Sequence, residues 1–399
     1  MKKIYMDQAA TSFPKAPGVI EGMVEFMSQV GTNINRGSYE NAYETAEIVY
    51  ETREQLCNFF DFTPLAGNAK NVIFTPGITY ALNFIIKGYL QTGDHVLVSS
   101  MEHNAVMRPL VQLQKDRGIT FSRIPCTKEG ELQRDAIETM IQNNTKAIIM
   151  THGSNVCGTL MPIKEVGEIS HRYGLKFIVD SAQTAGTFPI SMRDMHIDAL
   201  AFTGHKGLLG PQGIGGFLIT DEMADQMTPL VTGGTGSISD TEETPTFLPD
   251  KFEAGTLNLP GIMGLHRSLN YLEKSRIDQI RENELKLTQQ FIDGLSEIKG
   301  IHIIGKTTCE NRSAVVSLQT DTLDEAILAF RLDQEYHIMT RVGMHCSPNA
   351  HKTLGTFPEG TIRFSFGYSN TEEEVNYAIK AIKECYESNR TKPKAIPTK

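Results

Sequence analysis

Between residues 71 and 220, short apolar runs rich in β-branched residues alternate with segments whose apolar residues recur every three to four positions. Runs of the first kind indicate buried strands, and the segments between them indicate amphipathic helices. Because parallel strands need a long crossover connection, strands that alternate with helices predict a largely parallel sheet covered by helices. The six expected strands are residues 71–74, 95–100, 146–150, 177–180, 199–202 and 216–219.

After residue 220 the pattern changes. Glycines and prolines between residues 229 and 260 predict a long ordered loop. The expected elements beyond it are a helical stretch over 262–296, a strand over 314–318, a helix over 324–334 and a strand over 361–366. Thr371 and Glu374 form a capping box that opens the last helix. We therefore expect a large α/β domain followed by a smaller α+β domain.

Charge and hydropathy exclude several classes of protein. The chain has 38 Lys+Arg and 47 Asp+Glu, a net charge of −9, and no internal basic block, which argues against a nucleic-acid partner. It has no apolar run of the roughly 18 residues that a membrane helix needs. Two lysines near the start are followed by no apolar segment, so we expect no signal peptide and a cytoplasmic protein without a membrane partner.

Cysteine spacing is equally restrictive. The six cysteines stand at positions 57, 126, 157, 309, 346 and 385, and no two lie within four residues of each other. This spacing excludes redox and zinc signatures of the CxxC type. Five of the six are expected to be small buried hydrophobic residues in a reducing compartment.

Polar residues follow five of the six expected strands. In chain order they are Thr79, His103, Asn155, Asp180 with Gln183, and His205 with Lys206. Ligands of open parallel sheets bind outside the carboxyl ends of the strands. We therefore expect these side chains to share one site.

The residue types in this set favour an aldehyde cofactor that carries a phosphate. A desolvated lysine such as Lys206 can form a Schiff base, and Asp180 can keep a pyridine nitrogen protonated. The flat ring of His103 can lie over such a cofactor. A helix that opens after Gly77 offers backbone N–H groups to a phosphate. Together these features predict pyridoxal 5′-phosphate.

Two other motifs do not support a site. Residues 300–307 read GIHIIGKT and match the P-loop pattern, but the middle residues are strand-like and no helix pattern follows, so we expect no nucleotide there. His345, Cys346 and His351 lie close in sequence, yet no fourth ligand is near them. We therefore expect no metal site.

Several motifs occur together in a characteristic order. They are YMDQAAT at residues 5–11, Glu102-His103, Ser154-Asn155, Asp180-x-x-Gln183, TGHK at 203–206, FEAGT at 252–256 and RVGMHC at 341–346. With them the chain resembles, nearly end to end, the class V (fold type I) pyridoxal-phosphate enzymes, and among these the group II cysteine desulfurases and selenocysteine lyases. The resemblance implies a large domain with a mainly parallel seven-stranded sheet (residues 21–262), a smaller C-terminal α+β domain (263–399), and a segment 1–20 that packs with the small domain.

The resemblance also implies a cofactor site. Lys206 would form the Schiff base and move protons, Asp180 would pair with the pyridine nitrogen, and Gln183 with the ring hydroxyl. His103 would stack on the ring and assist proton transfer. The phosphate would be bound by Thr79, Thr203 and His205, with Thr256 contributed by the partner subunit of a homodimer.

The substrate side of the site is implied in the same way. Asn155 and Arg363 would hold the substrate carboxylate, with Asn35, Arg36 and Arg341 nearby. Cys346, on a short ordered loop, would take sulfur from L-cysteine as a persulfide and leave alanine. His345, Arg341 and Arg363 are expected to support the thiolate with positive charge.

This sequence also departs from the family pattern. Gln8 replaces the usual Asn, Asn35 replaces a His, and Ser38-Tyr39 stands where another His is usual. The last two positions face the substrate in relatives, so the choice between L-cysteine and L-selenocysteine stays open, as does a sulfur-acceptor protein. Two further readings also stay open. One is another class V reaction (aminotransferase, racemase or C–S lyase), and the other is a non-catalytic carrier.

Overall fold

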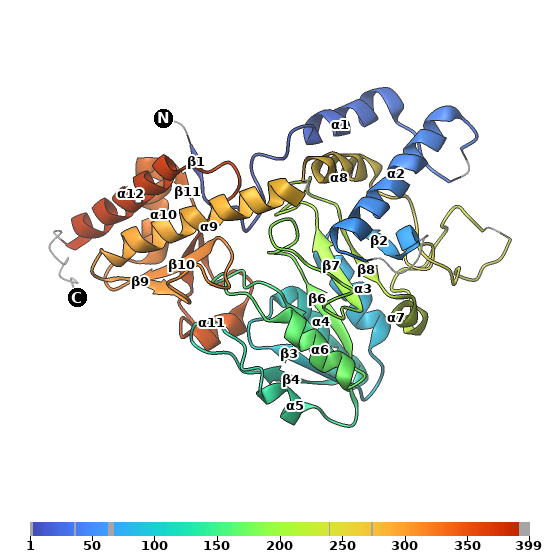
Figure 1. Ribbon diagram of the computed structural model, residues 1–399, viewed down its shortest axis with the longest axis horizontal. Helices are drawn as coiled ribbons and strands as arrows, with labels where there is room; N and C mark the ends of the chain where they lie inside the picture. The colour runs from blue at the N-terminus through green and yellow to red at the C-terminus, as the bar shows by residue number, and fades with distance from the viewer. Residues whose placement is uncertain (1–2, 36, 63–67, 239, 273, 391–399) are drawn as a thin grey trace, which may run out of the picture.

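The computed structural model describes residues 3–35, 37–62, 68–238, 240–272 and 274–390 (Figure 1). Its larger part is built on a seven-stranded sheet. In spatial order the strands are β2 (Val72–Thr75), β8 (Gly215–Ile219), β7 (Ala199–Thr203), β6 (Lys176–Asp180), β5 (Thr145–Thr151), β3 (His95–Ser99) and β4 (Thr120–Ile124). The expected seven-stranded sheet is thus confirmed.

The sheet is parallel from β4 to β7, and β8 reverses direction. Because β8 is antiparallel to both β7 and β2, the strand β2 again runs parallel to β7. The carboxyl ends of β2, β3, β5, β6 and β7 therefore meet at one edge of the sheet. Six strands coincide with the expected runs, whereas β4 was not expected.

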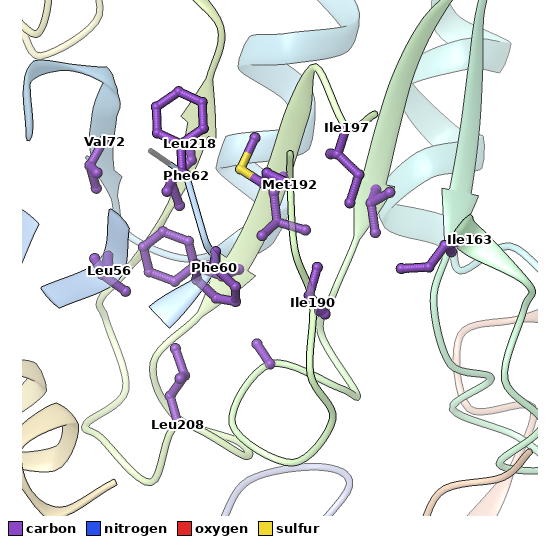
Figure 2. Close-up of a cluster of buried hydrophobic side chains, with 14 of the residues drawn as sticks. Leu56, Phe60, Phe62, Val72, Ile163, Ile190, Met192, Ile197, Leu208 and Leu218 are labelled. Carbon is purple, nitrogen blue, oxygen red and sulfur yellow. The ribbon is translucent and has the colours of Figure 1, made fainter. Parts of the chain in front are cut away.

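Helices cover both faces of this sheet. They are α1 (Val19–Glu25) with the π-helical η1 (Phe26–Val30), α2 (Glu40–Phe59), the 3-10 turn η2 (Asn68–Asn71), α3 (Ile78–Tyr89), α4 (Asn104–Arg117), α5 (Ala136–Met140), α6 (Ile163–Arg172), α7 (Asp221–Gln226) and α8 (Leu259–Tyr271). Alternate residues of a strand enter opposite cores: Val96 and Val98 belong to the core to which α3 and α4 contribute, and Leu97 to the core to which α2, α6 and α8 contribute. Figure 2 shows part of the core that contains Leu97, at the place where Leu56 and Phe60 lie near β2 and β8.

The smaller part contains a four-stranded antiparallel sheet in the order β12 (Arg341–Gly343), β13 (Thr361–Ser365), β10 (Val315–Thr320) and β9 (Ile301–Ile304). Its helices are α9 (Lys274–Ser296), α10 (Glu325–Tyr336), α11 (Pro348–Leu354) and α12 (Glu372–Arg390). The P-loop-like segment 300–307 contains β9, so it cannot form a phosphate-cradling loop followed by a helix. None of the described helices is both long and apolar enough to cross a bilayer.

The helical stretch expected over 262–296 is two helices, α8 and α9, and the division expected at residue 262 falls inside α8. The N-terminal strand β1 (Ile4–Tyr5) pairs in parallel with β11 (Ile338–Met339) of the smaller part. The residues that follow then reach the larger part, where the backbone N–H of Ser12 donates to the carbonyl of His205 at 2.8 Å. The N-terminal segment thus connects the two parts, and α9 extends from the α8 end of the larger part to the smaller sheet (Figure 1).

Candidate active site

The shared sheet edge brings the expected strand-end residues to one side of the molecule. Asp180 and Thr203 are the last residues of β6 and β7, and His103 is the N-cap of α4 after β3. Asn155 follows β5, and Gln183, His205 and Lys206 follow β6 and β7. The topology therefore places all of these residues at the ligand-binding edge of the sheet.

Lys206 and Asp180 form the electrostatic centre of the site. Burial lowers the pKa of Lys206 to about 8, and the Asp180 carboxylate opposes that shift. Asp180 is 2% exposed, and its burial raises its pKa, while the N–H of Ala182 and the Lys206 cation act in the opposite direction. Ala182 N donates to Asp180 Oδ1 at 2.9 Å. Burial therefore raises the pKa of the Asp180 carboxyl and lowers the pKa of the Lys206 amine, and each charge partly offsets the shift of the other.

His103 is held as a neutral ring. Its Nδ1 accepts the N–H of Ala105 at 3.0 Å, which caps α4. Burial, with the Lys206 charge as the second cause, lowers the pKa of His103 to about 4. A neutral imidazole that accepts at Nδ1 carries its proton on Nε2. His103 therefore offers a flat, uncharged face near Lys206.

The residues expected around a phosphate lie in different environments. Thr203 is buried, whereas Thr79, in the first turn of α3, is exposed. His205 Nδ1 lies 3.1 Å from Thr11 Oγ1, and burial lowers the pKa of His205 to about 4. Thr256 is exposed and lines a pocket of about 290 Å³ with Thr75 and Tyr80.

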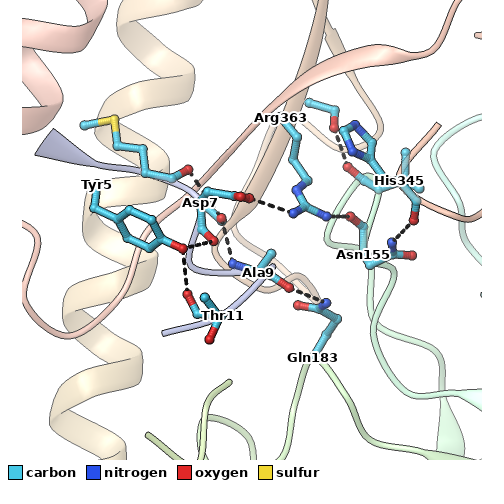
Figure 3. A network of polar contacts seen from close by, with 12 residues as sticks. Tyr5, Asp7, Ala9, Thr11, Asn155, Gln183, His345 and Arg363 are labelled. Atoms are coloured by element: carbon cyan, nitrogen blue, oxygen red, sulfur yellow. Dashed lines mark hydrogen bonds and ion pairs between the residues drawn. The ribbon is translucent and has the colours of Figure 1, made fainter. Parts of the chain in front are cut away.

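At the other end of the group, Arg363 on β13 lies between Asp7 and Asn155 (Figure 3). Its side chain is almost fully buried; one terminal nitrogen donates to Asp7 Oδ1 and the other to the carbonyl of Asn155, both at 2.9 Å. Its Nε has no hydrogen-bond partner among the described residues. Arg341 stands opposite Arg363 in the β12–β13 ladder and is exposed. Asp7 offsets the charge of Arg363, so Arg341 supplies the net positive charge at this end of the site.

Cys346 lies on a short loop that is fixed to the strand ends. The thiol-bearing residue is exposed, and both His345 and Cys346 adopt left-handed backbone angles, with φ of 46° and 58°. Non-glycine residues rarely adopt this conformation, which costs roughly 1–2 kcal/mol each. Asn104 N donates to the Cys346 carbonyl at 2.9 Å, and Asn155 Nδ2 to that of His345 at 2.6 Å. These bonds hold the loop against the segments that follow β3 and β5.

His345 does not supply positive charge to the neighbouring thiol. Burial, aided by Arg363, lowers the pKa of His345 to about 2. Its Nε2 lies 3.0 Å from Thr361 Oγ1. The expectation of a cationic His345 is therefore wrong, because a neutral ring is the only form that this pocket accepts near neutral pH. Of the three residues expected to support the Cys346 thiolate with positive charge, Arg341 and Arg363 remain.

One expected substrate residue, Asn35, is bonded to a segment outside this group. The Asn35 side chain donates to the carbonyl of Thr235, at 2.9 Å, in the long loop between α7 and α8. Asn35 itself is exposed and has a left-handed φ of 74°. Arg36 lies outside the described residues.

Glu102 and Asp7 are two acidic residues of the site to which the sequence analysis assigned no role. Glu102 is fully buried, and both of its carboxylate oxygens accept the N–H of Thr151, at 3.0 and 3.1 Å. This contact joins the ends of β3 and β5 next to His103, and burial raises the pKa of Glu102 to about 8. Both residues occur in the quoted motifs, which was the available signal, but Thr151 and Arg363, which they bind, are distant in sequence.

Known proteins share the sequence of this chain over most of its length. The sequence matches the family profile described as "Aminotransferase class-V" over residues 4–377. A probable cysteine desulfurase of Methanothermobacter thermautotrophicus is 31% identical over 386 residues, with 96% of this chain and 94% of the relative covered. A probable cysteine desulfurase of Vibrio cholerae is 33% identical, with 95% and 92% covered.

Solved structures of cysteine desulfurases have the same fold as this chain. The apo cysteine desulfurase of Thermococcus onnurineus superposes with a TM-score of 0.90 at 30% identity, covering 97% of this chain and 95% of that one. A cysteine desulfurase of Escherichia coli, solved with an S-sulfonic acid, gives 0.86 at 27% identity, with 97% and 95% covered. The resemblance drawn from the motifs is confirmed. The chain belongs to the aminotransferase class V family, whose members are pyridoxal-phosphate-dependent enzymes.

Proposed function

We propose that this protein is a pyridoxal-phosphate-dependent cysteine desulfurase that releases alanine from L-cysteine and takes the sulfur onto Cys346. The observation that carries this proposal is the fixed Cys346 loop. It presents an exposed cysteine at the same sheet edge as Lys206 and Asp180. The relatives named above as cysteine desulfurases support the same activity.

The residues at the sheet edge fit the cofactor. Lys206 would hold its aldehyde carbon and Asp180 its pyridine nitrogen, while Gln183, which donates to the Ala9 carbonyl at 3.1 Å, would face the ring hydroxyl. The free N–H groups at the start of α3 suit the phosphate. When bound, the protonated ring supplies an electron sink for the substrate Cα.

The positive end of the site suits the substrate carboxylate. Arg363 is buried and has an unused N–H donor at Nε. A guanidinium pairs with a carboxylate through two parallel hydrogen bonds, which fixes the orientation of the amino acid as well as its affinity. Arg341, opposite Arg363, adds a second positive charge.

Sulfur transfer then depends on Lys206 and Cys346. With a pKa near 8, Lys206 can accept the proton of the substrate Cα and return a proton to carbon. The Cys346 thiolate attacks the substrate sulfur, and a sulfur–sulfur bond forms as the Cβ–sulfur bond breaks. The electron pair of the broken bond stays with carbon, and protonation there completes alanine. The exposed Cys346 persulfide can pass its outer sulfur to an acceptor protein.

We further propose a homodimer. Exposed apolar residues form two stripes at helical spacing, one on α1 and η1 and one along α2. They are Ile20, Val24 and Met27, and Tyr39, Tyr43 and Tyr50. Stripes of this kind mark interaction surfaces. The family resemblance implies that a second copy would contribute its Thr256 to the phosphate site.

The test is alanine release from L-cysteine and from L-selenocysteine by the wild type and by Cys346→Ala. The desulfurase assignment requires that the wild type release alanine from L-cysteine and that Cys346→Ala lose this activity. Alanine from selenocysteine alone, with or without Cys346, would instead assign a selenocysteine lyase. No alanine from either substrate would contradict both activities and leave a different class V reaction.

A further inference from the structure

We infer that Asp7 is a positioning residue, which holds the Arg363 guanidinium so that its Nε edge faces the incoming substrate carboxylate. This inference rests on the proposed function, because it takes Arg363 as the carboxylate-binding group. It adds a role for a residue of the N-terminal segment that acts through Arg363.

The contacts of Arg363 leave one N–H of the guanidinium, that of the buried Nε, without an acceptor among the described residues. Asp7 Oδ1 binds one terminal nitrogen and the Asn155 carbonyl binds the other, both at 2.9 Å, while Nε has no partner among the described residues (Figure 3). A guanidinium is planar and rigid, so two anchors fix both its plane and its rotation. The anchors come from opposite parts of the chain, since Asp7 lies 356 positions from Arg363 and Asn155 follows β5.

Asp7 is itself firmly placed. The Tyr5 hydroxyl donates to the carbonyls of Asp7, at 3.1 Å, and Thr11, at 3.0 Å, and Ala10 N also donates to the Asp7 carbonyl. Burial and the neighbouring Asp7 raise the pKa of Tyr5 to about 12, so the hydroxyl stays a donor. On both sides of Asp7 the backbone is bound to Ser365, two residues beyond Arg363. The segments that carry the carboxylate and the guanidinium are therefore joined by an isolated β-bridge between Asp7 and Ser365.

The unpartnered Nε–H of Arg363 destabilises the protein unless a ligand accepts its hydrogen bond. A buried donor without an acceptor is rare in folded proteins. Asp7 binds only a terminal nitrogen, so it does not use Nε. A substrate carboxylate that accepts from Nε would satisfy this donor and complete the two-point pairing that guanidinium groups favour.

A purely structural ion pair is the alternative explanation. Arg363 is 2% exposed, so Asp7 also neutralises a buried charge. That role predicts lower stability after substitution, without selective loss of ligands that carry a carboxylate. The two roles therefore differ in a binding experiment.

The experiment is isothermal titration calorimetry of the holoenzyme with L-alanine, which has an amine and a carboxylate, and with 2-aminoethanethiol, which has no carboxylate. In Asp7→Ala we expect the affinity for L-alanine to fall about tenfold or more, since small displacements of a binding group have effects of this size. The affinity for 2-aminoethanethiol should stay unchanged. Asp7→Asn keeps an acceptor oxygen and should recover most of the loss.

Asp7→Glu provides a second variant in case Asp7→Ala does not fold. It keeps the negative charge but moves it by one methylene. A positioning role therefore predicts weaker L-alanine binding, whereas a merely neutralising role predicts unchanged L-alanine binding. Glu372→Gln is the matched control, because it removes one carboxylate from an exposed ion pair with Lys286 on the smaller part. Steady-state kinetics with L-cysteine should show the same pattern, with a higher KM in Asp7→Glu and little change in kcat.

Arg363→Gln separates this inference from the proposed function. If Arg363→Gln weakens L-alanine binding while Asp7→Ala and Asp7→Glu leave it unchanged, the positioning role is overturned and the proposed function stands. Equal losses for both ligands in the Asp7 variants would overturn the positioning role as well. If Arg363→Gln itself leaves L-alanine binding unchanged, the carboxylate site lies elsewhere and both proposals are contradicted on this point.

Discussion

Opposing effects set the protonation of Lys206. Burial lowers the pKa of its amine, the neighbouring Asp180 raises it, and the outcome is about 8, against an ordinary value of 10.5. His103 beside it is neutral, because burial and the Lys206 charge both lower its pKa. One nucleophilic amine and one uncharged ring therefore coexist near neutral pH.

The pH dependence of cofactor capture tests this state. Only the neutral amine attacks an aldehyde, so the rate at which the apoprotein captures pyridoxal phosphate should rise with pH and be half-maximal near pH 8. Stopped-flow absorbance measures this rate. Lys206→Ala should show no Schiff-base band at any pH. A midpoint near 10.5, or a band retained in Lys206→Ala, would contradict the assignment.

Residues at strand ends could be predicted from sequence, whereas long-range partners could not. Lys206, Asp180 and His103 follow separate apolar runs, and the geometry of parallel sheets alone brings such positions together. Asp7 and Arg363 meet only because β1 pairs with β11 and the next residues bind Ser365. No local pattern encodes that pairing. The neutral state of His345 likewise depends on burial, which its exposed-loop motif does not indicate.

Among the elements, the edge strand β2 and the segment that carries Thr256 are joined by one buried ion pair. Arg53 on α2 pairs with Glu253, with its two terminal nitrogens at 3.1 and 2.7 Å from the two carboxylate oxygens. Glu253 also accepts the N–H of Phe74, at 2.7 Å. The pair therefore ties α2, β2 and residues 252–256 together just before the first turn of α3.

Removal of one partner of this pair should be costly. Glu253→Gln leaves the Arg53 charge buried and uncompensated, which should lower the free energy of unfolding by about 3–5 kcal/mol in urea titrations. The double variant Arg53→Met with Glu253→Leu removes both charges and should recover most of that loss. If Glu253→Gln lowered the free energy of unfolding by less than about 1 kcal/mol, the Arg53–Glu253 pair would contribute no more than an exposed ion pair, which contradicts this prediction.

Helix α9 carries a buried carboxyl that should make stability depend on pH. Glu284 is 8% exposed, and its carboxyl has no hydrogen-bond or ion-pair partner among the described residues. Burial raises its pKa from 4.5 to about 8. Between these values the unfolded chain releases a proton that the folded chain keeps, so Glu284 makes the free energy of unfolding fall as pH rises from 4.5 to 8.

Glu284→Gln should flatten this part of the pH dependence and stabilise the protein above pH 8, where the native carboxyl must ionise in a buried position. Urea unfolding at several pH values measures the effect. Glu372→Gln, which changes an exposed carboxylate on α12, serves as the control. Parallel curves for Glu284→Gln and the wild type would show that the carboxyl is solvated in the folded state.

The elements that sequence patterns missed are those with weak periodicity. The edge strand β4 reads TFSRI and is largely exposed or half-buried, so it has no apolar run, and its pairing with β3 defines it. The stretch over 262–296 looks continuous because helical residues fill it. It divides into α8, which packs on α1 and α2, and α9, which packs on the smaller sheet.

For the whole molecule, the two apolar stripes on α1, η1 and α2 predict an obligate dimer. Val24 is 53% exposed at the middle of the first stripe, so Val24→Asp should leave the fold intact but introduce a charge into the interface. Sedimentation equilibrium should then show monomers, and the holoenzyme should lose cofactor on dialysis if Thr256 of the second copy completes the phosphate site. Wild-type protein that sediments as a monomer would contradict the dimer.

The most direct test of the central claim is mass spectrometry of the holoenzyme after exposure to L-cysteine without a reductant. The proposed function predicts that the peptide carrying Cys346 gains the mass of one sulfur atom, that a thiol reductant removes this mass, and that Cys346→Ala gains none. Alanine formation without added mass on this peptide, or added mass on a different cysteine, would contradict the assignment of Cys346 as the sulfur acceptor.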